Sequence, residues 1–400
     1  MAPSVPCPSL YQGGTQAIIA PDLTTLELGF DVPALPGMAE SDILTPALII
    51  DLDAFEDNVE RMRSLCASHS VRHRAHAKMH RSVDVAKYQI EKGNAVGICC
   101  QKVSEAEVFV RAGFTDVMIS NEVTDPARID RLAKLARRAR ILVCVDDFAN
   151  LDALSRSAQD HDVIIEALAE LDVGAGRCGV KTSHNAIDLG CAIAATPGLH
   201  FAGIQAYHGP AQHLIKYAER HAAIARAVET VKAACLGLQA RGLSCDIIAG
   251  AGTGTAQFEA ASGVYNEVQA GSYAFMDASY GAIEDADGRS STNFRHALFV
   301  LTSVMSVVGP GRAVCDAGLK SQSLDSGLPK VWGHETLDVL SCNDEHLMIA
   351  DPDSILKCNQ RLRLIPGHCD PTCNLHDWYV CVRNGVVETL WPVSARGKSI

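Results

Sequence analysis

The chain has 400 residues, of which 48% are apolar and 20% are charged, and its formal net charge is −12. This composition is typical of a folded globular protein and excludes a disordered chain, while the acidic balance without clusters of Lys and Arg argues against a nucleic-acid partner. No run of eighteen apolar residues and no secretory leader pattern occurs, so we expect neither a membrane span nor secretion.

The 15 cysteines are scattered through apolar runs and odd in number, which argues against a disulfide framework. We expect most of them to be buried free thiols. Cys99 and Cys100 should point to opposite faces if they lie on one strand. The cysteine content therefore indicates a reducing, cytoplasmic compartment, with organelle targeting left open.

Residues 1–44 are expected to be an irregular N-terminal extension that packs partly on the C-terminal domain, because proline and glycine interrupt its first part. Regular elements begin after Thr45-Pro46, with a buried strand at 47–52. Further strands are predicted at 71–75, 95–99, 116–120, 140–146, 163–172, 201–207, 246–250 and 266–270. Apolar residues at three- and four-residue intervals predict helices at 54–66, 104–112, 126–139 and 213–240.

The alternation of strands and helices predicts a parallel sheet. Eight or nine strands between residues 46 and 272, without a dinucleotide-binding GxGxxG after the first, favour a closed barrel over an open doubly wound sheet. After residue 295, alternating runs separated by turn residues predict an all-β domain. We therefore predict an α/β fold, with a (β/α)8 TIM-type barrel over residues 45–288 and a C-terminal β domain over residues 289–400.

Lys78 follows the predicted strand at 71–75, at the face where such barrels hold their active sites. The segment from Arg74 to Arg81 places four other basic side chains around it, which predicts a lowered pKa and an amine free for Schiff-base formation. The alternative is a solvated basic loop. Polar residues also follow other strands, among them Gln101, Arg177 and Tyr207.

Two glycine-rich segments follow late strands, where barrels typically hold phosphate groups. Their backbone N–H groups and hydroxyls suit an anion, although a turn without a ligand is the commoner meaning of either segment alone. The segments consist of Gly252, Thr253, Gly254, Thr255, Gly271, Ser272 and Tyr273. Neither is a P-loop, so they indicate a small phosphorylated cofactor and not a nucleoside triphosphate.

A candidate metal motif lies in the predicted β domain. On an extended chain His368 and Asp370 project to the same side and Cys369 points away, so the first two could share one metal. An imidazole and a carboxylate suit manganese, magnesium or zinc. Two ligands require water or further donors, such as Asp344 or His346. The alternative is a polar turn with capping roles.

With these residues the chain closely resembles the D-threonine aldolase family, a fold-type III group of pyridoxal 5'-phosphate (PLP) enzymes that includes D-serine dehydratases and is related to alanine racemases. The segments that carry the resemblance are 76–78, 97–106, 119–122, 172–180, 205–209, 269–277 and 316–320. The related dehydratases have His-x-Cys where the aldolases have His-x-Asp. This chain has His368-Cys369-Asp370, which favours the aldolase.

The resemblance implies that Lys78 holds PLP as a Schiff base. It implies that Arg177 partners the pyridine nitrogen, that Tyr207 borders the cofactor and that Gln101 belongs to the same site. Both glycine-rich segments would hold the phosphate. The family also implies a homodimer.

The resemblance further implies a divalent metal on His368 and Asp370, manganese first, with magnesium or zinc as alternatives. His213 would lie near the substrate hydroxyl and Asp344 near the metal. Together with Lys78, these two residues complete the predicted catalytic set.

The implied activity is that of a carbon–carbon lyase that cleaves D-threonine and related D-β-hydroxy amino acids to glycine and an aldehyde. The alternative within the family is a metal-dependent D-serine or D-3-hydroxyaspartate dehydratase. A third interpretation is a non-catalytic PLP-binding protein with the same barrel. The C-terminal β domain and the pair of His368 and Asp370 argue against the third.

Overall fold

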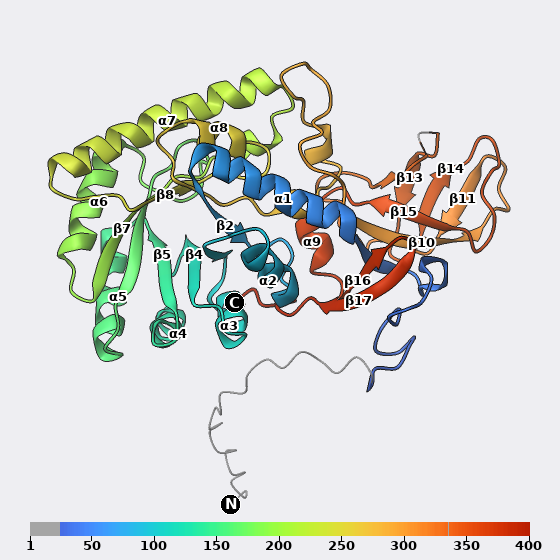
Figure 1. Ribbon diagram of the computed structural model, residues 1–400, viewed down its shortest axis with the longest axis horizontal. Coiled ribbons are helices and arrows are strands. Elements are labelled where there is room, and N and C mark those ends of the chain that lie inside the picture. Colours follow the sequence, from blue (N-terminus) through green and yellow to red (C-terminus); the bar gives the residue numbers. More distant parts are fainter. Residues whose placement is uncertain (1–24, 335) are drawn as a thin grey trace, which may run out of the picture.

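The computed structural model describes residues 25–334 and 336–400. A closed barrel of parallel strands, β2 to β9, lies beside a nine-stranded sheet. Figure 1 shows the barrel with its helices on one side of the molecule and most of this sheet on the other. The arrangement confirms the prediction of an α/β barrel followed by a β domain.

The barrel is built from alternating strands and helices. Neighbouring strands are parallel, and β9 pairs with β2 to close the ring. Its strands are β2 (Arg72–His76), β3 (Gly97–Cys100), β4 (Asp116–Glu122), β5 (Arg140–Val145), β6 (Ile165–Glu170), β7 (Leu199–Gln205), β8 (Ile247–Gly250) and β9 (Glu267–Val268). The helices between the strands are α2 (Val83–Glu91), α3 (Val103–Arg111), α4 (Pro126–Ala136), α5 (Phe148–Asp160), α6 (Ser183–Ala195), α7 (Tyr217–Ala240) and α8 (Ala256–Ala261).

Successive side chains on the barrel strands alternate between the interior and the helix-covered exterior. Cys99 belongs to a small interior cluster with Met118, Leu142 and Leu168. Cys100 packs in the large cluster between strands and helices. The prediction that the two cysteines face opposite sides is therefore confirmed.

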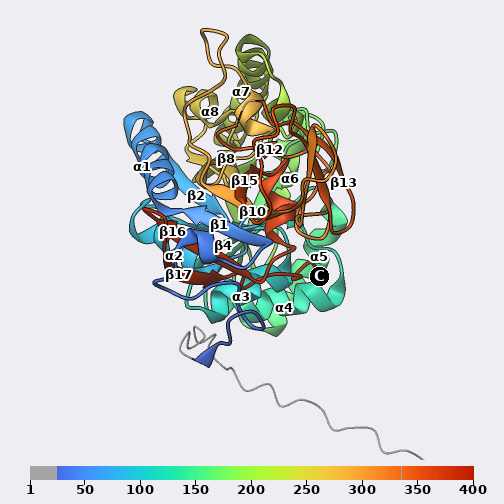
Figure 2. The same cartoon turned by 90° about the vertical axis from the view of Figure 1, so that its right-hand side faces the viewer.

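The structure differs from the prediction at the first strand. Strand β1 (Ala47–Asp51) does not open the barrel but lies in the C-terminal sheet, antiparallel to β10 and parallel to β16 (Figure 2). Leu48 and Ile50 pack in one core and Ile49 in another, so both faces of β1 are covered. A continuous apolar run indicates such a strand but not the sheet that contains it.

The C-terminal sheet combines strands from both ends of the chain. Its path is β13-β14-β11-β10-β1-β16-β17, and β15 pairs with β10 and β12. The strands after the barrel are β10 (Leu298–Ser306), β11 (Arg312–Cys315), β12 (Lys330–Val331), β13 (Val339–Cys342), β14 (Leu347–Ala350), β15 (Arg361–Ile365), β16 (Trp378–Arg383) and β17 (Val386–Pro392). The short helix α9 (Cys369–Cys373) connects β15 to β16.

Helix α1 (Leu52–His69) runs from the C-terminal sheet across the barrel (Figure 1). Asp51 caps its start, since the side chain accepts the N–H of Ala54 at 3.0 Å. Its buried apolar face has the helical spacing and consists of Leu52, Phe55, Val59, Met62 and Cys66. The core under this face contains residues of both the barrel and the β domain, so α1 holds the two together.

The described part of the N-terminal extension, residues 25–44, lies along the hairpin of β16 and β17. The N–H of Gly37 donates to the carbonyl of Val387, and the N–H of Val387 donates to the carbonyl of Met38. Glu40 forms an ion pair with Arg363 at 2.6 Å. The part of the extension before residue 25 lies outside the described residues.

The helix predicted from residue 213 begins later in the structure. His213 lies in the 3-10 turn η3 (Pro210–His213), and α7 starts at Tyr217. In the segment between His213 and α7, the carbonyls of Leu214 and Ile215 accept hydrogen bonds from the guanidinium of Arg220. These hydrogen bonds hold both carbonyls outside the helical path.

All cysteines within the described residues are free thiols. None of the helices in that part of the chain is both long and apolar enough to cross a membrane.

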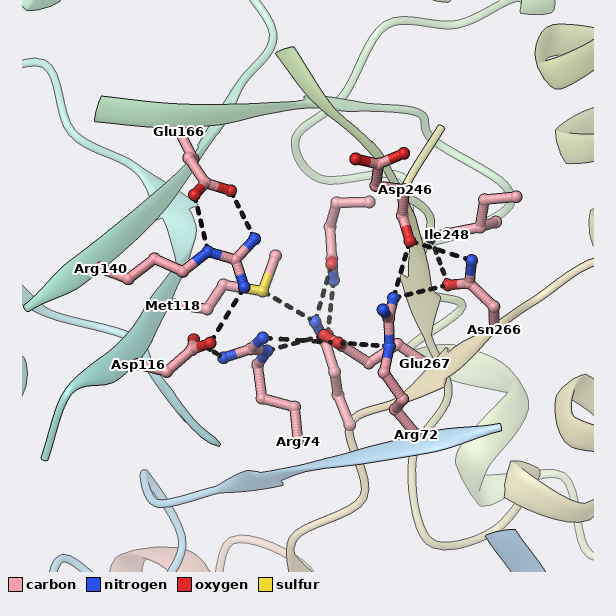
Figure 3. A network of polar contacts seen from close by, with 12 residues as sticks. Arg72, Arg74, Asp116, Met118, Arg140, Glu166, Asp246, Ile248, Asn266 and Glu267 are labelled. Carbon is pink, nitrogen blue, oxygen red and sulfur yellow. Dashed lines mark hydrogen bonds and ion pairs between the residues drawn. The ribbon is translucent and has the colours of Figure 1, made fainter. Parts of the chain in front are cut away.

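A network of charged side chains closes the barrel at the amino ends of its strands (Figure 3). Nε of Arg74, on β2, donates to Oε1 of Glu267, on β9, at 2.7 Å, and the guanidinium also pairs with Asp116 on β4. The side chains of Arg74 and Glu267 are each 1% exposed. Arg140 extends the network from Asp116 to Glu166. The buried pair thus joins the two strands at which the ring closes.

Replacing Glu267 by Ala should lower the free energy of unfolding by about 3–5 kcal/mol, because Arg74 would keep a buried charge without its main partner. Urea unfolding followed by circular dichroism measures this loss. The matched control is Glu345→Ala, which breaks an exposed pair with Lys320 and should cost less than about 1 kcal/mol. Equal losses for the two variants would contradict the assignment.

Candidate functional site

A cavity of about 270 Å³ opens at the carboxyl ends of the barrel strands, where barrel active sites lie. Its volume suits a small ligand. The lining residues are His76, Lys78, Gln101, Ser120, Glu170, Arg177, Gln205, Tyr207, Ala251, Gly252 and Gln269. The structure thus brings Lys78, Gln101, Arg177, Tyr207 and Gly252, all singled out from the sequence, into one cavity.

Lys78 forms an ion pair with Asp370, in which Nζ contacts Oδ2. Lys78 follows β2 and Asp370 lies in α9, so the pair joins the barrel to the β domain. Burial lowers the pKa of Lys78, but the charge of Asp370 outweighs burial and the net shift is upward. Burial raises the pKa of Asp370, but the charge of Lys78 holds it well below its usual range. The pair is therefore an ammonium with a carboxylate.

The expectation that basic neighbours lower the pKa of Lys78 is wrong. Arg74 points to the opposite end of the barrel, and Arg81 donates to the C-terminal segment. Burial lowers the pKa of His76 and of His80 to about 3, so both imidazoles are neutral. Residues adjacent in sequence therefore do not surround the lysine with positive charge.

His368 and Asp370 lie side by side at the start of α9. Nε2 of His368 is 3.7 Å from Oδ1 of Asp370, and Nδ1 of His368 is 2.7 Å from Oδ2 of Asp325. A carboxylate on Nδ1 keeps the proton there and leaves Nε2 as a lone-pair donor. This donor set, an oriented imidazole beside a carboxylate, fits a divalent metal.

Cys369 lies between these two residues in sequence, but its side chain is fully buried in the core. Burial raises the pKa of this thiol well above its ordinary value. Its Sγ donates to Oδ1 of Asp370 at 3.5 Å. Cys369 therefore supports the carboxylate as a protonated donor.

The first glycine-rich segment forms the loop after β8. Oγ1 of Thr253 is buried and has no hydrogen-bond partner in the part of the chain that is described. Such a hydroxyl is unfavourable unless a ligand satisfies it, so Thr253 is a ready donor for a bound anion. A Cβ on Gly252 or Gly254 would approach Gln212 to 2.6 Å. The hydroxyl of Thr255 already bonds two buried side chains and supports the loop.

Thr253 and Gly254 do not line the cavity of Lys78. They line a neighbouring cavity of about 520 Å³, whose wall also includes residues of α1, α8 and the segment 291–294. Gly252 lines the cavity of Lys78. The loop therefore separates the two spaces.

The second glycine-rich segment enters the 3-10 turn η4 (Ser272–Ala274). A Cβ on Gly271 would lie 2.8 Å from a backbone carbonyl at the end of β2, so glycine permits the close approach. Oγ of Ser272 donates to Asp370 at 3.3 Å. The side chain of Tyr273 is fully buried in the core and its hydroxyl accepts a hydrogen bond from α2, so its ring does not reach the cavity.

Three further predicted residues approach the cavity from different strand ends. Gln101 follows β3, and its amide donates to Oγ of Ser120 at 2.9 Å. Tyr207 follows β7, and burial raises the pKa of its hydroxyl. Arg177 lies in the loop after β6 and is exposed, and its guanidinium forms no ion pair with any described residue. It is thus available to a ligand.

The other two predicted catalytic residues lie outside the cavity lining. Nδ1 of His213 is 3.2 Å from Oγ of Ser279, and its ring centre is 5.7 Å from that of the buried Tyr280. Asp344 is exposed on the turn between β13 and β14, and its carbonyl accepts the N–H of Lys320. Within the described residues no contact joins it to the metal motif.

Sequence reasoning missed several polar residues of the site. They are Ser120, Glu170, Gln205, Gln269 and, beside the metal motif, Asp325. The alternation of side chains between the two faces of a strand could have found the inward-facing residues. Leu168 points into the barrel, and Glu170 follows two positions later on β6. Burial and the neighbouring Glu122 raise the pKa of Glu170 to about 9, which keeps it protonated at neutral pH. Asp325 lies in a turn without any periodic signal.

Comparisons with known proteins agree with this architecture. Residues 50–279 match the family model for the N-terminal domain of alanine racemase, and residues 297–382 match the model for a putative serine dehydratase domain. A 3-hydroxy-D-aspartate aldolase of Paracoccus denitrificans (strain Pd 1222) is 54% identical, with 94% of this chain and 98% of that protein covered. A D-threonine aldolase of Arthrobacter sp. is 46% identical, with 92% and 96% covered.

Among solved structures, the crystal structure of D-threonine aldolase from Filomicrobium marinum superposes with a TM-score of 0.90. Its sequence is 43% identical, and the match covers 92% of this chain and all of that one. The first family model spans more than half of the chain. Both relatives match this chain over nearly their full length. The chain therefore belongs to the fold-type III PLP family, with an alanine racemase N-terminal domain followed by a serine dehydratase domain.

Proposed function

We propose that this protein is a PLP-dependent, metal-assisted aldolase that cleaves a D-β-hydroxy amino acid to glycine and an aldehyde. The contact between Lys78 and Asp370 carries the proposal, because a lysine that could hold the cofactor lies against a carboxylate that could bind the metal. The aldolase names of both relatives support the same reaction class.

The chain's residues fit PLP. Lys78 would bind its aldehyde carbon, and Arg177 would face its ring nitrogen. Its phosphate would lie against the loop after β8, where the hydroxyl of Thr253 would have to turn from the neighbouring cavity to donate to it. The unpaired guanidinium and the buried hydroxyl without a partner each gain an anion or acceptor in this arrangement. Tyr207 and Gln101 would border the ring.

When bound, PLP supplies an electron sink for the pair left by a broken Cα–Cβ bond, and the divalent metal lowers the pKa of the β-hydroxyl. His368 and Asp370 would hold the metal, and Asp325 would fix the tautomer of His368. Nε2 of His213 would take the hydroxyl proton, since its Nδ1 lies against Ser279. Loss of this proton, cleavage of Cα–Cβ and addition of a proton at Cα give the aldehyde and glycine.

We infer two candidate substrates. D-Threonine would give acetaldehyde, and 3-hydroxy-D-aspartate would give glyoxylate, each with glycine. The names of the relatives support both. The homodimer remains a prediction of the family resemblance, and light scattering would test it. A role for Asp344 also remains a prediction, and substitution of this residue would test it.

Product analysis tests the proposed reaction. Purified protein should convert D-threonine or 3-hydroxy-D-aspartate, but not L-threonine, to glycine and the matching aldehyde. Manganese should be required and a chelator should stop the reaction. Lys78→Ala should abolish turnover, whereas Lys87→Ala, at an exposed lysine on α2, should retain it.

Ammonia with 2-oxobutyrate or oxaloacetate would instead identify the dehydratase, which uses the same lysine for β-elimination. The binding of PLP without any turnover would identify a non-catalytic carrier. Either result would overturn the aldolase.

Asp325→Asn should raise the manganese concentration needed for half-maximal activity by about 10- to 100-fold, because the imidazole of His368 loses the carboxylate that orients it. The affinity for PLP should stay unchanged, which separates this positioning role from general damage. Asp353→Asn, at an exposed acid of the same domain, is the control. An unchanged manganese requirement in Asp325→Asn would contradict the proposed positioning role of Asp325.

Thr253→Val should weaken PLP binding by about 10- to 100-fold, because a hydrogen bond to a charged phosphate contributes about 1.5–3 kcal/mol. The stability of the apoprotein should not fall, since this hydroxyl has no hydrogen-bond partner among the described residues. Titration of the apoprotein with PLP, followed by absorbance, gives the affinity. Thr255→Val should instead lower the stability, because its hydroxyl bonds Gln212 and Glu259. The proposal fails if Thr253→Val binds PLP normally.

A further inference from the structure

A second group of metal-ligand side chains lies at the carboxyl end of the barrel, apart from His368 and Asp370. Glu122 ends β4, Asp146 follows β5, and Cys178 lies in the loop after β6. One donor atom of each lies within 4.8 Å of the other two. The fold of the barrel therefore brings three segments, distant in sequence, to one point.

Within the described chain, no ion pair neutralises these carboxylates, and the charge of Arg177 only partly offsets the raised pKa of the adjoining Glu170. Oε1 of Glu122 is buried and has no hydrogen-bond partner. Asp146 accepts the N–H of Gly179 at 2.9 Å, but neither acid forms an ion pair with a described Lys or Arg. Acidic groups held together in this way repel one another unless a cation or a proton intervenes.

Glu170 provides an independent observation at the same place. Its side chain is only 8% exposed, and its carboxyl adjoins that of Glu122. Its Oε2 has no hydrogen-bond partner among the described residues. The proton that Glu170 carries at neutral pH relieves part of the repulsion but leaves this oxygen open, and a cation beside Glu122 would displace the proton and satisfy the open oxygens of both acids.

We propose that Glu122, Asp146 and Cys178 bind a second divalent cation of the zinc class, with Glu170 as a fourth or outer ligand. A thiolate selects zinc over manganese or magnesium, while carboxylates are acceptable to all three. A tetrahedral zinc ion with bonds of about 2.0–2.3 Å needs ligand atoms about 3.3–3.8 Å apart, so donor atoms within 4.8 Å of one another would need only to turn toward the ion. Binding releases the proton of Cys178.

The bound cation would fix the loop that carries Arg177. This loop follows β6, and Cys178 is the residue after Arg177. A bridge between Leu171 and Val180 holds the ends of the loop, and the N–H of Gly179 on Asp146 and hydrogen bonds to its own Asp172 hold its middle. A metal on Cys178 would tie it directly to β4 and β5.

The test uses the full-length His368→Ala/Asp370→Asn protein, which lacks the metal pair of the proposed aldolase. After equilibration with Zn²⁺, elemental analysis should find about one zinc per chain. With Co²⁺ instead, the protein should show thiolate-to-cobalt charge-transfer absorption in the near ultraviolet. Adding Cys178→Ser should abolish this absorption and weaken zinc binding by about tenfold or more.

Cys191→Ser, at a half-buried thiol on α6, is the matched control and should change neither readout. Glu122→Gln keeps the thiol and should weaken zinc binding on its own. This variant therefore tests the zinc site if Cys178→Ser does not fold. Absence of zinc from the starting protein, survival of the absorption in Cys178→Ser, or normal zinc affinity in Glu122→Gln would each overturn the site. Aldolase activity has no bearing on these readouts.

Discussion

The buried ion pair between Arg74 and Glu267 determines how the barrel closes. The two side chains come from β2 and β9, the strands that complete the ring, and both lie in its interior. A shift of either strand by one residue would turn its charge outward into the apolar layer beneath the helices, at a large cost. The register that keeps the pair together also sets where β2 ends, and therefore where Lys78 stands at the opposite end of the barrel.

An apolar layer separates these charges from the functional site. Met118, Leu142 and Leu168 fill the middle of the barrel, between the charge network below and the polar residues of the cavity above. Gln269 spans the boundary, since its amide contacts Met118 and pairs with Gln205. The ionic state of Lys78 therefore depends on the cavity itself and on Asp370, and not on the arginines of the opposite end.

Local patterns and the family resemblance predicted the barrel strands, the change to a β domain and five of the eleven residues that line the cavity. They failed where the outcome depends on contacts between distant segments. The apolar run of β1 has the same pattern in either sheet, and only pairing with β10 and β16 decides its place. Among the basic residues near Lys78 in sequence, Arg74 lies at the opposite end of the barrel, Arg81 bonds the C-terminal segment and both histidines are neutral, so their charges do not add at its amine. The dominant partner, Asp370, lies 292 positions away.

Asp370 links the two halves of the proposed chemistry. Its Oδ2 holds the ammonium of Lys78, while its Oδ1 faces Nε2 of His368. An amine must lose its proton before it can attack a carbonyl carbon, so the carboxylate that stabilises the ammonium opposes cofactor attachment. A divalent cation on His368 and Asp370 would neutralise that carboxylate and lower the pKa of Lys78. Because coupling between binding sites is reciprocal, cofactor attachment would in turn release Asp370 to the metal.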